Sequence, residues 1–358
     1  MKKAALMILA LVLCMNMSGC LGAVQADDYI YVVGIGFDKG SQYRFNVTFL
    51  VQKDVSGSEQ TSTGGAEIIS AEGDTLFDAI TVLSAGVPFR INFSRANTFF
   101  FGEEVARSGR IKELSNITFN ALKIRQSAKL MVCLGTAQRL MQGLCLEDVP
   151  NITKLQFSVF QDYAAEGITV ITNYAGMLES IRGRRSDPLM MLGGVDVSAV
   201  KKQESIAKEM TGAGEKSEGS DDEQEEQEEY TTDGVRRLGG MSPYVAGTAL
   251  FDGWYMKGTL SGYDTMFLLL GRGKLKKGAL KVQHNEEWAV LYIKDEKPPR
   301  VKLTLSGVPR AKVELEMACN IVKYKGAARS DEWGSGLQQT AEQLISNEMA
   351  RIFNICRE

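Results

Sequence analysis

The stretch YIYVVGIGFDKGSQYRFNVTFLVQ, residues 29–52, has the pattern of a β-hairpin. Residues 29–37 are apolar and rich in β-forming side chains, and Asp38-Lys39-Gly40-Ser41 supplies turn chemistry. From Tyr43 to Val51 apolar side chains then alternate with polar ones, which is typical of a strand with one buried face. We therefore predict that the first elements after residue 28 are two strands joined by a tight turn.

The remainder of the first half predicts further strands and helices in mixed order. Asp74 is a candidate N-cap for a helix that ends near Gly86 and Pro88. Short β-rich runs predict strands, and apolar residues spaced three and four apart predict helices. The expected strands are 97–101, 129–134 and the extended stretch 190–200; the expected helices are 111–124, 137–144, a segment around 152–163, and 175–181. These elements would form an N-terminal domain over residues 20–200.

Residues 201–243 have the composition of an acidic, flexible linker. Residues 215–229 alone hold nine acidic side chains and one lysine, a net charge of −8. A segment so poor in large apolar groups cannot bury enough surface to offset the entropy lost on ordering. We therefore expect this linker to be disordered.

Residues 244–358 predict a second, strand-rich domain that ends in a helix. An apolar stripe from Leu337 to Cys356 predicts a final helix that packs on a sheet. The expected strands are 245–251, 254–260, 265–270, 288–292, 301–305 and 313–321. The whole sequence therefore predicts an α+β fold, in which two domains of mixed and antiparallel sheets carry packed helices and are joined by the acidic linker.

The N-terminus has the composition of a secretory signal. Lys2 and Lys3 precede an apolar stretch, residues 4–15. That stretch is shorter than the roughly 20 residues that a bilayer-spanning helix needs, and it fits the apolar region of a signal peptide. We therefore expect export, with residues 1–19 removed.

The signal ends in Met17-Ser18-Gly19-Cys20, which has the form of a lipobox. Signal peptidase II would recognise Met17, Ser18 and Gly19 and cleave before Cys20, whose thiol would carry diacylglycerol, with palmitate as an expected acyl chain. Two acyl chains hold a protein on a membrane durably. An ordinary signal peptide with an accidental cysteine is the alternative.

The charge balance favours no nucleic-acid partner. Loss of residues 1–19 removes Lys2 and Lys3, which leaves 39 basic and 44 acidic residues and a net charge of −5. Outside the run 215–229 the remainder carries about +3. That bias suits a body beside anionic lipid but is too small to predict nucleic-acid binding.

The cysteines predict neither a zinc site nor a redox site. Cys133, Cys145, Cys319 and Cys356 remain after the signal and the lipidated residue, and no two of them have CxxC spacing. Each lies on an apolar stretch, so buried thiols are favoured, and disulfide bridges are the alternative in an exported protein.

No catalytic, cofactor or metal site is predicted. The single histidine, His284, has no ligand-type neighbour and is expected at the surface. Gly34-Ile35-Gly36 follows a strand but lacks a third glycine and a following helix, so it does not predict phosphate binding. Glu103 and Glu104 are adjacent and are expected to be solvated charges, and the run 99–101 of phenylalanines is expected to be a buried strand.

In several stretches the chain resembles the Ger(x)C family of spore germination lipoproteins. The stretches that carry the resemblance are the lipobox at Cys20, VVGIGFDKG (32–40), AEGDTLFDAI (71–80), FSRANTFFFGEEVARSG (93–109), KIRQSAKLMVCLGTAQRLM (123–141) and GTALFDGWYMKGTLSGYDTMFLLLGRGKLKKG (247–278). The resemblance implies a lipid-anchored C subunit of a nutrient germinant receptor, working with integral-membrane A and B subunits and lying on the outer face of the cell membrane or the spore inner membrane. It implies no catalytic residues, and Cys20 is the one functional residue that it carries over.

The chain departs from that family pattern in three places. Leu21-Gly22 stands where the family commonly has Trp-Asp, the linker is expanded, and the sequence ends at Glu358, where relatives usually continue through a helical stretch and a strand. One expectation is that the last sheet lacks a strand and has an edge that a partner covers, and a truncated C-terminal domain is the alternative. Two other functions compete with the receptor subunit. A solute-binding lipoprotein predicts two βαβ-type lobes, whereas we expect the strands here to run as hairpins. A cell-wall hydrolase needs a carboxylate or histidine cleft.

Overall fold

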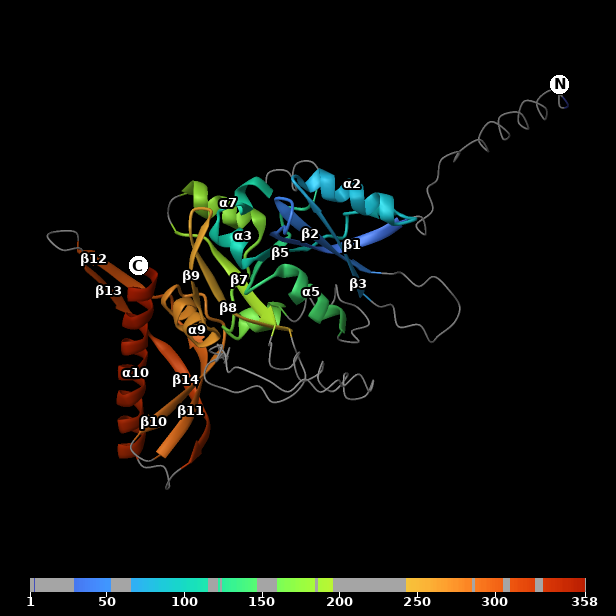
Figure 1. The fold of residues 1–358 in the computed structure, drawn as a ribbon. Helices are drawn as coiled ribbons and strands as arrows, with labels where there is room; N and C mark the ends of the chain where they lie inside the picture. Colours follow the sequence, from blue (N-terminus) through green and yellow to red (C-terminus); the bar gives the residue numbers. More distant parts are fainter. Residues whose placement is uncertain are drawn as a thin grey trace, which may run out of the picture.

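The computed structural model describes residues 29–52, 66–114, 124–146, 160–183, 186–195, 243–284, 287–304, 310–325 and 331–357, with Lys3 and Leu122 as single residues (Figure 1). The predicted signal peptide, the lipobox and residues 201–242 of the predicted linker lie outside this set. Among the described residues, none of the helices combines the length and hydropathy that crossing a bilayer requires.

The larger part of the protein is built on one mixed sheet. Its main path has the order β3-β2-β1-β5-β6-β7-β8-β9, and β4 also pairs with β1. The strands are β1 (Tyr29–Lys39), β2 (Phe45–Gln52), β3 (Ala66–Gly73), β4 (Arg90–Asn92), β5 (Thr98–Gly102), β6 (Lys129–Cys133), β7 (Leu189–Val195), β8 (Pro243–Asp252) and β9 (Tyr255–Leu260). The central strands β1, β5, β6 and β7 run parallel, and antiparallel strands flank them on both sides. The mixed sheet confirms the predicted fold class.

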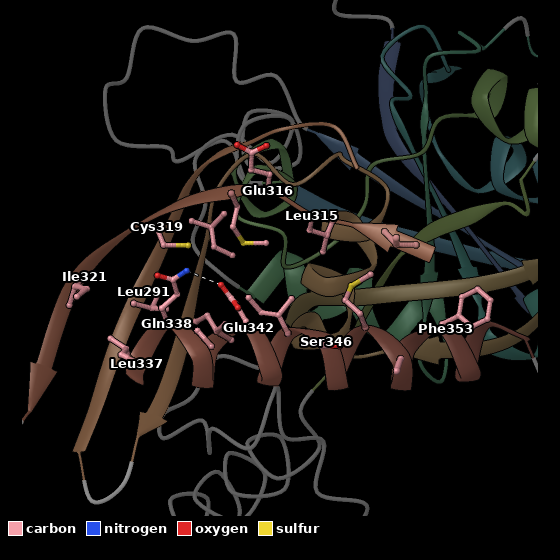
Figure 2. Close-up of a pocket in the computed structure, with 18 of the residues that line it drawn as sticks. Leu291, Leu315, Glu316, Cys319, Ile321, Leu337, Gln338, Glu342, Ser346 and Phe353 are labelled. Atoms are coloured by element: carbon pink, nitrogen blue, oxygen red, sulfur yellow. Dashed lines mark hydrogen bonds between the residues drawn. The ribbon is translucent and has the colours of Figure 1, made fainter. Parts of the chain in front are cut away.

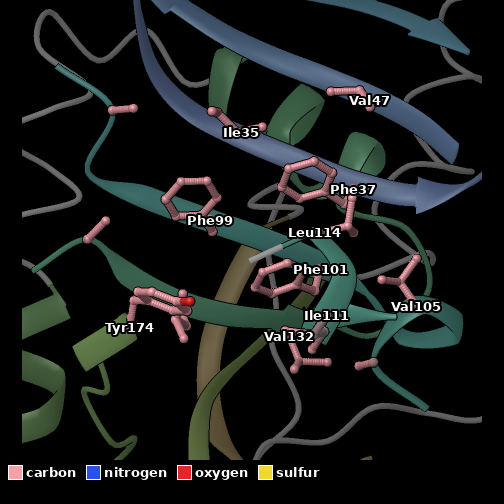
Figure 3. Close-up of a cluster of buried hydrophobic side chains, with 14 of the residues drawn as sticks. Ile35, Phe37, Val47, Phe99, Phe101, Val105, Ile111, Leu114, Val132 and Tyr174 are labelled. Carbon is pink, nitrogen blue, oxygen red and sulfur yellow. The ribbon is translucent and has the colours of Figure 1, made fainter. Parts of the chain in front are cut away.

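The predicted hairpin forms as β1 and β2. Phe37 lies opposite Val47 and Ile35 lies opposite Phe49 in an antiparallel register. The run 99–101 forms the buried strand β5, as predicted, and its side chains alternate between the two faces of the sheet. Phe99 and Phe101 join Phe37 in a cluster on one face (Figure 3), whereas Phe100 lies in a separate cluster on the other.

Helices cover both faces of this sheet. Its helices are α2 (Leu76–Gly86), α3 (Glu103–Arg107), α5 (Ala137–Leu146) and α7 (Tyr174–Gly183). Buried residues of α2, α3 and α7 belong to the cluster around Phe99, and those of α5 belong to the cluster around Phe100. The N-cap of α2 is Thr75, which forms a capping box with Asp78, and not the predicted Asp74.

The sheet continues across the predicted linker. Strand β8 begins at Pro243 and pairs with β7, which ends at Val195. The strands β8 and β9, which we predicted in the second domain, therefore extend the sheet of the first. The domain boundary at residues 201–243 stays a prediction.

The C-terminal part contains two smaller sheets and a long helix (Figure 1). Its elements are α9 (Gly262–Gly271), β10 (Gly278–His284), β11 (Glu287–Glu296), β12 (Arg300–Thr304), β13 (Arg310–Glu314), β14 (Met317–Lys325) and α10 (Asp331–Arg357). An antiparallel sheet has the order β10-β11-β14, and β12 pairs only with β13 among the described strands. Helix α10 contacts α9 and β10, and confirms the predicted C-terminal helix.

Two of the predicted strands in this part are wrong. Residues 265–270 belong to helix α9, because Ser261 and Asp264 form a capping box that starts a helix just before the apolar run. The single strand predicted at 313–321 is divided between β13 and β14, with Leu315 and Glu316 between them.

Candidate functional site: a groove beside the C-terminal helix

A groove of about 1070 Å³ lies between α10 and the strands β11 and β14 (Figure 2). Apolar side chains of the strands form its floor, and an apolar stripe of α10 forms its wall. They include Leu291, Ile293, Leu315, Met317, Cys319, Ile321, Leu337, Ala341, Ile345, Met349 and Phe353. The groove therefore presents a largely hydrophobic surface, which suits binding more than chemistry.

The position of α10 on the sheet explains why the groove exists. The helix contacts β10 and α9, and Met349 lies close to Gly271 of α9. The sheet has the order β10-β11-β14, so a helix that contacts β10 leaves the β14 side less covered. Strand β14 is an edge strand among the described strands.

The polar groups of the groove are few and mostly bonded to neighbours. Glu316 is paired with Lys297, and this hydrogen bond and ion pair lower the pKa of Glu316. Gln338 donates a hydrogen bond of 2.8 Å to Glu342, drawn as a dashed line in Figure 2. Partial burial raises the pKa of the Cys319 thiol.

Inside the large sheet, Asp38 ties β1 to helix α5. Its carboxyl oxygens accept hydrogen bonds from the backbone N–H groups of Ala137, at 2.7 Å, and Gln138, at 2.9 Å. Asp38 is 3% exposed, and burial raises its pKa while the two backbone bonds oppose that rise. Gly102 leaves the space that Asp38 occupies, because a Cβ at Gly102 would collide with the Asp38 carboxyl. The local pattern at Asp38 predicts only a turn and gives no sign of this role.

A second carboxylate fixes the turn between β1 and β2. Glu72 of β3 accepts hydrogen bonds from the backbone N–H groups of Ser41 at 2.8 Å, Gln42 at 3.0 Å and Tyr43 at 3.3 Å. The Ser41 hydroxyl donates another bond to it at 2.8 Å. These bonds lower the pKa of Glu72 to about 2, chiefly through the Ser41 and Gln42 amides. Asp38 and Glu72 both lie in stretches that carry the family resemblance.

The sequence singles out Cys20 and His284, of which the structure describes His284. Cys20, with Met17, Ser18 and Gly19 before it, lies outside the described residues. His284 is partly buried against α10, where its Nδ1 lies 2.8 Å from the Thr340 hydroxyl, so the predicted surface position needs correction.

Glu103 and Glu104 form ion pairs, and Gly36 packs closely against a helix. Glu103 is paired with Arg107, and Glu104 with Lys39. Gly36 allows close packing, because a Cβ there would lie 2.6 Å from the Met141 sulfur of α5. Among the described residues, no group of three or more histidine, cysteine or acidic side chains could hold a metal ion.

The four described cysteines are free thiols, but they are not all buried as favoured. Cys133 is buried, Cys145 is partly buried, and Cys319 and Cys356 are exposed. Cys319 is exposed because it lies on an edge strand that α10 does not cover.

Comparison with known proteins identifies both halves of the chain. A sequence model described as spore germination protein N-terminal domain matches residues 22–191, and one described as spore germination B3/GerAC like, C-terminal, matches residues 246–358. A Bacillus subtilis (strain 168) protein that carries the name spore germination protein YfkR is 28% identical over 152 residues. That match covers 40% of this chain and 39% of the relative, so the chain spans about two fifths of the curated relative's length. The crystal structure of the GerBC protein matches with a TM-score of 0.47 and 12% identity, over 89% of this chain and 80% of the other.

Proposed function

Because this chain belongs to the GerAC-like family of spore germination proteins, we propose that it is the lipid-anchored C subunit of a nutrient germinant receptor. The observation that carries the proposal is the presence of both family regions in order, over residues 22–191 and 246–358. In this proposal the chain works beside integral-membrane A and B subunits and performs no catalysis itself.

The proposed mechanism rests on the tether. Diacylglycerol on Cys20 would hold the folded body at the outer face of the cell membrane, and at the spore inner membrane in the spore. Confinement to the same surface as the A and B subunits raises the effective concentration of the body, so weak interfaces with them become occupied. The groove beside α10 and the edge strand β14 are surfaces that such an interface would use.

A solute-binding lipoprotein that delivers a nutrient to a transporter is the second candidate. We expected the strands to run as hairpins, which argues against βαβ lobes, but β1, β5, β6 and β7 run parallel. A polar cleft of about 860 Å³, lined in part by Thr169, Asn173 and Lys274, also offers room for a small solute.

Replacing Cys20 with alanine tests the tether. In a spore-forming host, Cys20→Ala should move the protein from the membrane fraction, washed with high salt, to the soluble fraction and impair nutrient germination. Cys145→Ala is a matched control, because it removes a thiol of α5, away from the groove, and should change neither result. Unchanged partitioning of Cys20→Ala into the salt-washed membranes would argue against the anchor.

Purified protein separates the competing functions. A rise in melting temperature with one nutrient, in a panel of amino acids and sugars, would favour the solute-binding protein. Release of fragments from spore cortex would favour a hydrolase. The receptor subunit predicts neither result, and predicts genes for A- and B-type membrane subunits beside its own.

A further inference from the structure

One end of the C-terminal part combines cations with exposed apolar side chains. We call it the ribbon end, after the two-stranded ribbon β12–β13 that projects there beside the C-terminus of α10 (Figure 1). Its residues are Arg272, Lys274, Lys276, Arg300, Val301, Lys302, Val313, Phe353 and Ile355.

The loop 272–277 after α9 presents three of the cations on a fixed backbone. Gly273 has a φ of +61°, and the Lys274 N–H donates to the carbonyl of Leu269 at 2.9 Å, so the helix ends in a Schellman motif. Leu275 is buried in the core of the C-terminal part. Arg272, Lys274 and Lys276 are exposed and make no ion pair with other described residues, whereas the neighbouring Lys277 is paired with Glu166.

The ribbon β12–β13 is incompletely stabilised by its own contacts. Lys302 lies directly opposite Lys312, and like charges in such a pair are unfavourable. Val301 lies opposite Val313, and these side chains remain 53% and 43% exposed. A two-stranded ribbon is at best marginally stable in water, so this one gains from a surface that covers its exposed valines.

The pieces of the ribbon end are contiguous. A Cβ at Gly273 would lie 2.6 Å from Pro299, the residue before β12. Burial raises the pKa of the Cys356 thiol near the end of α10, and the positive charge of Arg272 opposes that rise, so the two residues lie near each other. Val313 and Phe353 line the same groove, and Phe353 and Ile355 are 60% and 37% exposed.

Acidic groups offset little of this charge. Glu314 is paired with Lys312 and Glu316 with Lys297, so each is already neutralised by a lysine. Glu179 and Asp187 line the same polar cleft as Arg272, Lys274 and Lys276, but no ion pair joins them to these cations. Among the described side chains, the ribbon end is therefore net cationic beside large exposed apolar groups.

We propose that the ribbon end is a docking surface for an anionic phospholipid bilayer. Cations attract the negative surface of such a bilayer, and apolar side chains beside them enter the boundary between head groups and acyl chains. The surface would orient the folded body on the membrane, which a flexible N-terminal tether alone does not do. This role goes beyond the proposed function and does not depend on lipid at Cys20.

Vesicle binding tests the proposal on the chain from residue 20 onward with Cys20→Ser, which carries no acyl group. The protein should float with vesicles that mix phosphatidylcholine with phosphatidylglycerol, and much less with phosphatidylcholine alone. Added salt should weaken the binding, because it screens exposed charges. Each surface cation contributes about fivefold to such partitioning, so the combination of Lys274→Gln, Lys276→Gln and Lys302→Gln should weaken it about a hundredfold.

A matched control removes the same charge elsewhere. Arg90, Arg125 and Arg139 are exposed on the larger part of the protein, and replacing all three with glutamine should leave vesicle binding within about threefold. Replacing Phe353 and Ile355 with serine should weaken binding at least about tenfold, since it removes the apolar contact while keeping the charge. Circular dichroism should show an unchanged helix content in every variant.

Three results would overturn the proposal. The first is no binding to either kind of vesicle. The second is an equal loss of binding in the control and in the lysine variant. The third is a dimer in solution that the Phe353 and Ile355 substitutions dissociate, which would assign this end to a contact between two copies. None of these results bears on the receptor role, because that role is tested by the membrane partners.

Discussion

Replacing Asp38 with alanine should destabilise the large sheet by about 3 kcal/mol. The substitution removes two hydrogen bonds, of 2.7 and 2.9 Å, that hold the first amides of α5 against β1 in a buried site. Each bond contributes about 1 kcal/mol net, and amides left buried without an acceptor add at least about 1 kcal/mol more. Loss of a helix cap alone costs up to about 2 kcal/mol, which agrees in size.

Urea unfolding of the mature chain measures this loss as a lower midpoint, and hydrogen exchange at the Ala137 and Gln138 amides localises it. Asp38→Asn keeps one carbonyl oxygen as an acceptor and should cost about 1–2 kcal/mol. Asp162→Ala is the control, because Asp162 is exposed and should change stability by less than about 0.5 kcal/mol. If Asp38→Ala shifts the midpoint no more than Asp162→Ala, Asp38 does not hold α5.

Three further predictions follow from the described contacts. Glu72→Gln should remove part of the pH dependence of the free energy of unfolding. The pKa of Glu72 is lowered to about 2, so its carboxylate stabilises the fold above its unfolded pKa near 4.5, and this stabilisation is lost as pH falls toward 2. Acid unfolding titrations of both proteins would show the difference. Gly102→Ala should lower the urea midpoint at least as much as Asp38→Ala, and the double variant should lower it by less than the sum, because both disturb one contact. In native protein Cys319 should react with a thiol reagent within minutes, whereas Cys133, buried and with its pKa raised by desolvation, should react only after unfolding.

Each of these predictions has a contradicting result. Identical acid titrations of wild type and Glu72→Gln would mean that the turn amides do not bind this carboxylate in solution. Additive effects of Gly102→Ala and Asp38→Ala would mean that the two residues act separately. Rapid labelling of Cys133 in the native protein would mean that the face of the sheet under α5 opens readily.

The sequence predicts elements well where the pattern is local. The hairpin of residues 29–52 and the final helix both follow from side-chain periodicity within one segment. The run 265–270 was assigned to a strand because a short apolar run does not distinguish a strand from a buried helix, and the capping residues Ser261 and Asp264 decide the matter. Helix start signals thus carry information that periodicity lacks.

Local sequence patterns do not predict contacts between segments that are far apart in the chain. The Asp38 bond to Ala137 joins residues 99 positions apart, and nothing near Asp38 in sequence indicates its partner. The parallel pairing of β1 with β5 likewise needs a crossover that hairpin patterns do not suggest. The groove exists because α10 rests toward β10, which depends on packing with α9 and not on the stripe along the helix.

Affinity capture of the native protein from spore membranes tests the central claim most directly. A tagged chain, solubilised in mild detergent, would be isolated and its co-purifying proteins identified by mass spectrometry. The account predicts that A- and B-type integral-membrane subunits come with it and are absent from a parallel capture of an unrelated tagged lipoprotein. Recovery of the chain with a transporter permease instead, or with no membrane protein at all, would contradict it.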